Sequence, residues 1–357
     1  MKFSCFSYKI PFSQPLQTSG QTFRHRRGFI LSYKKENNQL YGEAAPLPGF
    51  STESYKSVQK TLTSLKDTIS KKLAGPNPID ELQKFYQDEE IPPSLQFGLD
   101  ALAYQIEARE NGKSLLSYLF ADTFPKVEVN TLISLQAESV LKNVAREVAL
   151  GFNTIKCKIG LYFERELTLL QEIRNKYPDL TIRVDANQAW DFDEALDHCN
   201  QLNKLDIEYC EEPLKEITPA TLEELSQYTS LPIALDESTT QYSYWPNLLP
   251  FTKCLIMKPM VIGSFRKNIE TKRLANTHNN KVVVTTSLES GVGRYFTGLL
   301  AAGLGTPNTA HGLSTGFLLA EDVFPEKNVI TEGSIDLSSR KIPTINFDQQ
   351  QLFTKLF

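Results

Sequence analysis

Two hydrophobic patterns alternate along residues 127–313. Short runs rich in β-branched residues, typical of buried strands, are separated by segments whose apolar residues recur every three or four positions, as on one face of a helix. The predicted strands cover residues 127–134, 154–159, 181–186, 207–211, 232–236, 254–258 and 281–286, with a weaker strand or turn near 309–313. The predicted helices cover residues 139–150, 163–177, 192–204, 219–228, 245–250, 264–277 and 293–303. Seven or eight such βα units favour an α/β fold, a modified (β/α)7-8 TIM-like barrel, over an open doubly wound sheet.

The first third of the chain has a different pattern. Apolar alternation predicts antiparallel strands at 3–10, 28–33 and 39–43, and helical spacing follows at 53–73, 79–86 and 94–111. A polar loop is predicted from Ser13 to Arg27, and a second loop covers 44–54; each is either a solvated connector or a contact to a ligand. The predicted domains are an α+β N-terminal capping domain (1–125), a (β/α) barrel catalytic domain (126–320) and a C-terminal segment (321–357) that packs on the capping domain.

Composition narrows the class of protein. The chain has 357 residues, 41% of them hydrophobic and 22% charged, as in a globular protein. A net charge of −4 argues against a nucleic-acid or anionic-membrane partner and leaves a small molecule as the expected one. The five cysteines form no Cys-x-x-Cys pair and are expected to be reduced core thiols. Charges interrupt the N-terminal apolar residues early, and no apolar run is long enough to span a bilayer, so we expect a cytoplasmic protein.

Charged residues end five consecutive predicted strands. They are spaced 22 to 27 residues apart, about one strand, one helix and two loops, so they should meet at one end of the barrel. The residues are Lys158, Asp185, Glu211, Asp236 and Lys258. Three carboxylates without a nearby His or Cys set are hard oxygen ligands of the kind that Mg²⁺ prefers. The alternative is a salt-bridge cluster between these acids and the lysines.

The two lysines belong to the second and sixth predicted strands and should face each other across the barrel mouth. Lys156 shares a strand face with Lys158; it either lowers the pKa of that lysine or pairs with a carboxylate. The arrangement suits removal of a proton next to a carboxylate, with a metal stabilising the resulting ene-diolate. Beyond the seventh strand, Ser287, Ser290 and Gly291 either donate hydrogen bonds to a substrate carboxylate or cap the next helix.

These residues resemble the o-succinylbenzoate synthase family of the enolase superfamily, in its muconate-lactonizing-enzyme-like subgroup. The superfamily motifs are Lys-Cys-Lys at 156–158, Asp-Ala-Asn at 185–187, Glu-Glu-Pro at 211–213, Asp-Glu-Ser at 236–238 and Lys-Pro at 258–259. The family-level motifs are Glu-Ala-Ala-Pro-Leu-Pro-Gly-Phe-Ser at 43–51, Ser-Leu-Glu-Ser-Gly at 287–291 and His-Gly-Leu-Ser-Thr-Gly at 311–316. The similarity covers nearly the whole chain.

The resemblance implies an activity and a set of roles. The reaction would be the Mg²⁺-dependent syn-dehydration of 2-succinyl-6-hydroxy-2,4-cyclohexadiene-1-carboxylate to o-succinylbenzoate in menaquinone biosynthesis, with Mn²⁺ as an alternative metal. Lys158 would act as general base and then general acid, and Lys258 would stabilise the negative charge of the intermediate. Asp185, Glu211 and Asp236 would hold the metal. The substrate would lie among Lys156, Arg183, Asn187, Ser287, Ser290 and Gly312.

Other functions fit the same two lysines. N-succinylamino acid racemases and dipeptide epimerases share this site. The epimerases usually carry an Asp-x-Asp in the last barrel loop, where this chain has His311-Gly-Leu-Ser-Thr, which argues against them. An inactive barrel that acts as a binding protein would have no need to keep both lysines.

Overall fold

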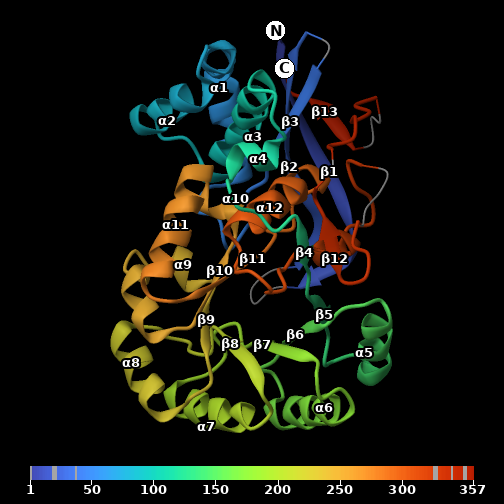
Figure 1. The fold of residues 1–357 in the computed structure, drawn as a ribbon, viewed down its shortest axis with the longest axis vertical. Helices are drawn as coiled ribbons and strands as arrows, with labels where there is room; N and C mark the ends of the chain where they lie inside the picture. The colour runs from blue at the N-terminus through green and yellow to red at the C-terminus, as the bar shows by residue number, and fades with distance from the viewer. Residues whose placement is uncertain (1, 18–21, 37, 325–328, 339–340, 349–351) are drawn as a thin grey trace.

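The computed structural model describes residues 2–17, 22–36, 38–324, 329–338, 341–348 and 352–357 (Figure 1). An antiparallel sheet with helices forms one end of the molecule, and a parallel sheet wrapped by helices forms the other (Figure 1). This arrangement confirms the predicted fold class, an α/β barrel with an α+β N-terminal part.

The capping sheet has the order β13-β1-β2-β3. Its strands are β1 (Lys2–Gln17), β2 (Thr22–Lys35), β3 (Asn38–Ala44) and β13 (Phe353–Lys355). The predicted loop over 13–27 is wrong where the structure describes it, because β1 and β2 continue as a hairpin to the Leu16–Phe23 and Gln17–Thr22 pairs. Thr18, Ser19 and Gly20, which the loop prediction included, lie outside the described residues. Hydrogen bonds between the backbones of β1 and β2 stabilise this extension without alternating apolar residues, so the hydrophobic pattern did not predict strands there.

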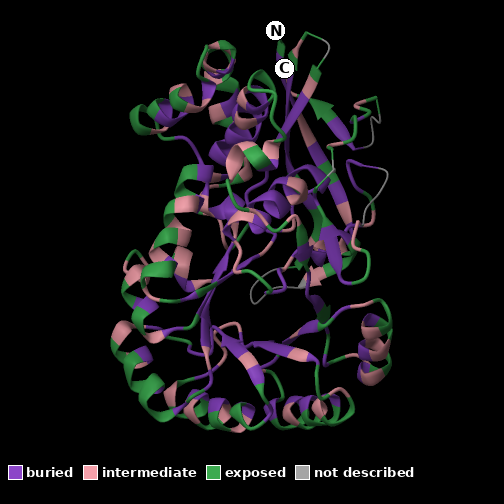
Figure 2. Ribbon diagram, viewed as in Figure 1, coloured by how far each residue is buried: buried purple, intermediate pink, exposed green. Residues whose placement is uncertain are grey.

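Four helices belong to the capping part: α1 (Tyr55–Ala74), α2 (Pro78–Asp88), α3 (Pro93–Glu110) and α4 (Leu115–Leu119). Most residues of α3 are buried, because the helix packs on β3 and also on the barrel helix α10 (Pro259–Ile262) (Figure 2). The approach to β3 depends on two glycines: a Cβ atom on Gly42 would overlap the carbonyl oxygen of Gly98. Only glycine lets the helix backbone come this close to the strand.

The barrel sheet is parallel with the order β11-β10-β9-β8-β7-β6-β5. Its strands are β5 (Thr131–Ile133), β6 (Thr154–Lys158), β7 (Thr181–Asp185), β8 (Ile207–Glu211), β9 (Ile233–Leu235), β10 (Cys254–Met257) and β11 (Lys281–Val284). The predicted eighth position closes the barrel by single bridges, from His311 to Val129 and from Gly312 to Thr285. The barrel is therefore closed at the position where a weaker strand or turn was predicted, and single bridges replace a full strand there.

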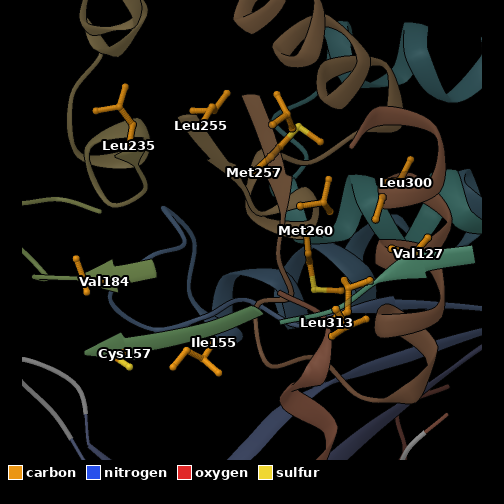
Figure 3. Close-up of a cluster of buried hydrophobic side chains, with 14 of the residues drawn as sticks. Val127, Ile155, Cys157, Val184, Leu235, Leu255, Met257, Met260, Leu300 and Leu313 are labelled. Carbon is orange, nitrogen blue, oxygen red and sulfur yellow. The ribbon is translucent and has the colours of Figure 1, made fainter. Parts of the chain in front are cut away.

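Helices cover the outside of the barrel. They are α5 (Val140–Ala149), α6 (Phe163–Lys176), α7 (Phe192–Asn203), α8 (Pro219–Tyr228), α9 (Ser238–Gln241), α11 (Phe265–Thr277) and α12 (Gly291–Leu304), with the 3-10 helix η1 (Trp245–Phe251). A second 3-10 helix, η2 (Ser314–Leu318), contributes residues to the pocket described below. The helix predicted at 245–250 is thus a 3-10 helix. Side chains alternate along the strands: Ile155 and Cys157 of β6 belong to the buried hydrophobic cluster (Figure 3), whereas Lys156 and Lys158 line a pocket inside the barrel.

Segments near the C-terminus pair with both parts of the molecule. Strand β12 (Ser334–Asp336) pairs with β4 (Lys126–Glu128), and β13 pairs with β1. The division at residues 125 and 320 remains a prediction. The five cysteines, Cys5, Cys157, Cys199, Cys210 and Cys254, are buried and free, as expected. Within the described ranges, the structure contains no helix with the length and apolar character needed to cross a membrane.

Candidate active site

A pocket lies at the carboxyl ends of the barrel strands and extends to the capping part. Its polar side is formed by Lys156, Lys158, Asp185, Asn187, Glu211, Asp236, Glu237 and Lys258. The capping part contributes Leu16, Phe23, Leu47, Pro48 and Phe50, and the barrel part adds Leu132 of β5, Leu288 and Leu318 of η2. The charged groups come from the ends of the barrel strands, and the side chains from the capping part are apolar, a lining that suits a small molecule with a carboxylate and an apolar body.

Lys156 lies between two of the predicted metal ligands. Its Nζ atom is 2.9 Å from Asp185 Oδ2 and 2.7 Å from Glu211 Oε2. Burial alone would lower the pKa of the Lys156 ammonium, but the two carboxylates hold its pKa well above the usual value. Lys156 therefore pairs with carboxylates and remains charged, which was one of the two roles left open by the sequence.

The acids form a group that fits a hard divalent cation. One carboxylate oxygen from each of Glu211, Asp236 and Glu237 lies within 4.8 Å of the others. Burial and the adjacent Asp185 carboxylate raise the pKa of Glu211 well above its usual value, and burial followed by Asp236 raises the pKa of Glu237 to about 7. Glu237 Oε2 is buried and has no hydrogen-bond partner within the described part of the chain. Crowded carboxylates with a free oxygen are the donor set that Mg²⁺ uses.

The two remaining lysines reach the pocket from separate strands. Lys158 ends β6, which lies next to β7, and Lys258 follows β10; the acid-bearing strands β7, β8 and β9 lie between them. The Lys158 side chain is exposed to the pocket. Lys258 Nζ contacts Asp236 Oδ1, and its Nζ atom lies 3.9 Å from the centre of the Phe50 ring. Two amines therefore flank the acids.

Arg183 lies below the pocket. Its side chain is 1% exposed, and its Nε atom donates to Glu208 Oε2 at 2.6 Å, on the side of the barrel away from the mouth. Nη1 donates to the Ala310 carbonyl at 2.7 Å. Since residues two apart on a strand share a face, Arg183 and Asp185 both point inward, but Arg183 fills the barrel interior and is not among the described residues that line the pocket.

Ser287 and Ser290 are also buried outside the described lining of the pocket. The backbone N–H of Ser290 donates to Glu43 Oε1 at 2.9 Å, and its hydroxyl donates to Glu43 Oε2. The Ser287 N–H donates to the Glu289 carboxylate. The donors at this helix N-terminus are therefore bound by the chain's own carboxylates, which explains why Ser290 does not face a ligand.

Asn187 and Gly312 do reach the pocket. Asn187 adopts a positive φ of 45°, which lets its side chain turn toward the neighbouring acid and donate to Glu237 Oε1 at 3.0 Å. Gly312 pairs with Thr285 across the closing bridge, and a Cβ atom at this position would overlap the Thr285 side chain. Only a residue without a side chain fits there, so the Gly312 backbone itself forms part of the wall.

Glu237 and Thr315 are polar pocket residues that were not among the predicted site residues. Glu237 was passed over because the resemblance assigned the metal ligand of the Asp-Glu-Ser motif to Asp236 alone. The lining hydroxyl of Thr315 is 2.7 Å from that of Thr286, and nothing in the pattern of residues 311–316 separates it from an ordinary turn. The position of Glu237, directly after a strand-end acid, was the one signal that could have found it.

Comparison with known families gives two matches along this chain. The family described as "Enolase C-terminal domain-like" matches residues 139–341, more than half of the chain, and the family described as "MenC, N-terminal domain" matches residues 1–106. The o-succinylbenzoate synthase of Pasteurella multocida (strain Pm70) is 27% identical over 360 residues, covering 97% of this chain and 98% of that protein.

Solved structures support the same fold. The N-succinyl Arg/Lys racemase from Bacillus cereus ATCC 14579 superimposes with a TM-score of 0.82 at 19% identity, covering 99% of each chain. The dipeptide epimerase from Enterococcus faecalis V583, solved with Mg and the dipeptide L-Leu-L-Tyr, gives a TM-score of 0.77 at 20% identity, covering 90% of this chain and 93% of that one. At these identities the structures speak for the fold alone. The family match over residues 139–341 shows that this protein belongs to the enolase superfamily, and its residues 1–106 match the MenC N-terminal domain family.

Proposed function

We propose that this protein is an o-succinylbenzoate synthase, a hydro-lyase that dehydrates 2-succinyl-6-hydroxy-2,4-cyclohexadiene-1-carboxylate in menaquinone biosynthesis. The observation that carries the proposal is that Lys158 and Lys258 line one pocket from β6 and β10, with the acids of β7, β8 and β9 between them. The named synthases matched by the chain over nearly its whole length support this substrate.

Lys158 would perform both proton transfers. Its neutral amine takes the proton from the ring carbon that bears the carboxylate, and the resulting ammonium returns this proton to the hydroxyl group as the C–O bond breaks. Water leaves and the ring becomes aromatic. Because one amine serves both steps, the proton and the hydroxyl must lie on the same ring face, so the elimination is syn.

Lys258 would stabilise the negative charge that builds on the ring carboxylate after proton removal. Its ammonium is fixed by Asp236 on one side and by the Phe50 ring on the other, so it needs little reorganisation as that charge develops. Asp185, Glu211 and Asp236 are the proposed metal ligands, with Glu237 beside them. When bound there, Mg²⁺ would supply positive charge next to the substrate carboxylate.

N-succinylamino acid racemisation is the second candidate, because the fold matches the N-succinyl Arg/Lys racemase along its whole length. Proton removal next to a carboxylate would need the same two lysines. Dipeptide epimerisation is less well supported. The acids among the described pocket-lining residues are Asp185, Glu211, Asp236 and Glu237, all at the proposed metal site, so none is left for a substrate ammonium group.

The test compares Lys158→Ala with Lys204→Ala, a variant of an exposed lysine at the end of α7. Ultraviolet absorbance should show o-succinylbenzoate formation by wild type and Lys204→Ala and its loss in Lys158→Ala. Unchanged turnover in Lys158→Ala would refute the base assignment. Wild-type protein incubated with N-succinyl amino acids in deuterated water should show no α-carbon exchange; rapid exchange without dehydration would favour the racemase.

A further inference from the structure

Arg26 of β2 lies at the contact between the capping part and the barrel. Its side chain is buried, and its guanidinium donates to backbone carbonyls of two loops that are more than 200 residues apart in sequence. The accepting carbonyls belong to Arg27, Ala45, Pro46, Ser287 and Leu288, at 2.5 to 3.2 Å. A planar guanidinium offers five donors in a fixed arrangement, so one side chain can hold both loops.

Both loops form walls of the pocket. The capping loop continues from Pro46 into Leu47, whose side chain lines the pocket, and the barrel loop contributes Leu288. Arg26 is not among the described residues that line the pocket. It therefore stands behind the apolar wall and acts on the pocket through the backbone of residues that do line it.

The barrel loop needs such support because Leu288 has a φ of 61°, in the left-handed region that a leucine rarely adopts. Strained backbone of this kind persists only where surrounding contacts fix it. Here Arg26 Nε binds the Leu288 carbonyl at 3.0 Å, and Glu43 binds the N–H of Ser290 two residues later. These contacts keep the Leu288 side chain directed into the pocket.

We propose that Arg26 is a positioning residue that sets the apolar wall formed by Leu47 and Leu288, and thereby determines how tightly the substrate ring is held. For the identity of the substrate, this inference rests on the proposed function. A lysine at this position would keep the positive charge but would lose the fork, so it could not bind the carbonyls of both loops at once. The two loops that carry Leu47 and Leu288 would then move apart.

The experiment compares Arg26→Lys with Arg24→Lys, a matched change on an exposed side chain of the same strand. Hydrogen–deuterium exchange should become faster in peptides covering 44–50 and 285–290 in Arg26→Lys alone, with α6 and α7 unchanged. KM for the cyclohexadiene substrate should rise about tenfold or more, while kcat changes less than about threefold, because neither Lys158, which transfers the proton, nor Lys258 is displaced. Unchanged exchange in both loops, or faster exchange throughout the chain, would overturn the proposal.

A second variant separates the wall from general stability. Leu288→Gly allows the positive φ without strain and removes the apolar side chain, so it should raise KM while leaving exchange at 44–50 as in wild type. Arg26→Lys should then raise KM by a smaller factor in the Leu288→Gly protein than in wild type. The same factor in both proteins would show that the two residues do not act on the same wall. If wild type formed no o-succinylbenzoate, the proposed function would fail, whereas the exchange measurements would still decide the role of Arg26.

Discussion

The buried His311 should make this protein sensitive to acid below neutral pH. Its ring lies at the bridge that closes the barrel and accepts a hydrogen bond from the Val284 N–H at Nδ1, 3.1 Å away. Protonation at Nδ1 would remove that acceptor. Burial first, and then the nearby Arg183 and Lys272, lower the pKa of His311 from 6.5 to about 3.

Because the pKa of His311 is lowered in the folded protein, the free energy of unfolding should decrease as the pH falls. A histidine whose folded pKa is lowered contributes stability above its unfolded pKa, and this stability is lost as the pH falls, because the unfolded chain binds the proton first. Between pH 7.5 and pH 5 the unfolded histidine becomes almost fully charged while the folded one stays neutral. The free energy of unfolding should therefore fall by about 2 kcal/mol from this residue alone.

The measurement is the free energy of unfolding in urea for wild type and His311→Gln at pH 7.5 and pH 5. Glutamine keeps an acceptor for the Val284 N–H but does not titrate. The variant should be less stable at pH 7.5, and its disadvantage should shrink by about 2 kcal/mol at pH 5. Contributions from other titrating groups cancel in this difference. An equal gap at both pH values would show that His311 is not held neutral.

Three further predictions concern packing, the buried Asp100 carboxyl group and the metal. Gly42→Ala should lower the free energy of unfolding by about 1–3 kcal/mol, because its Cβ would overlap the Gly98 carbonyl, whereas Gly298→Ala in α12, with room for a Cβ, should be neutral or stabilising in the same urea titration. Burial raises the pKa of Asp100 from 3.8 to about 7, so the stability that Asp100 contributes is present below pH 3.8 and is lost as the pH rises toward 7. In wild type the free energy of unfolding should therefore fall by about 2 kcal/mol between pH 5 and 7 because of this residue, and Asp100→Asn should remove that fall. The same change between pH 5 and 7 in both proteins would refute this prediction. Mg²⁺ at 100 times its Kd should stabilise wild type by about 2.7 kcal/mol, seen as a raised Tm, and Glu211→Gln should lose this response.

The strand-end charges were predictable because they depend on a repeating chain length. One strand, one helix and two loops occupy a nearly constant number of residues, so Lys158, Asp185 and Glu211 return to the same end of the barrel. The alternation of inward and outward side chains along β6 also follows from strand geometry. These regularities were enough for the fold class and for the group of acids and lysines at the mouth.

The sequence could not show how far each side chain lies from the pocket or which distant residue it binds. Arg183 and Asp185 share a strand face, yet the arginine lies in the barrel interior against Glu208 while the aspartate reaches the mouth. Ser290 has the residue type and position of a substrate donor, but its N–H and hydroxyl donate to the carboxylate of Glu43 in the capping part. Such outcomes depend on contacts between distant segments, and no periodicity within one segment encodes them.

The most direct test of the central claim is a crystal structure of the protein grown with Mg²⁺ and o-succinylbenzoate. We expect Mg²⁺ at about 2.0–2.1 Å from carboxylate oxygens of Asp185, Glu211 and Asp236. We also expect the product carboxylate beside the ion, with the Nζ atoms of Lys158 and Lys258 on opposite faces of the ring. A product bound elsewhere, or both amines on one side of it, would contradict the roles proposed for the two lysines and the acids.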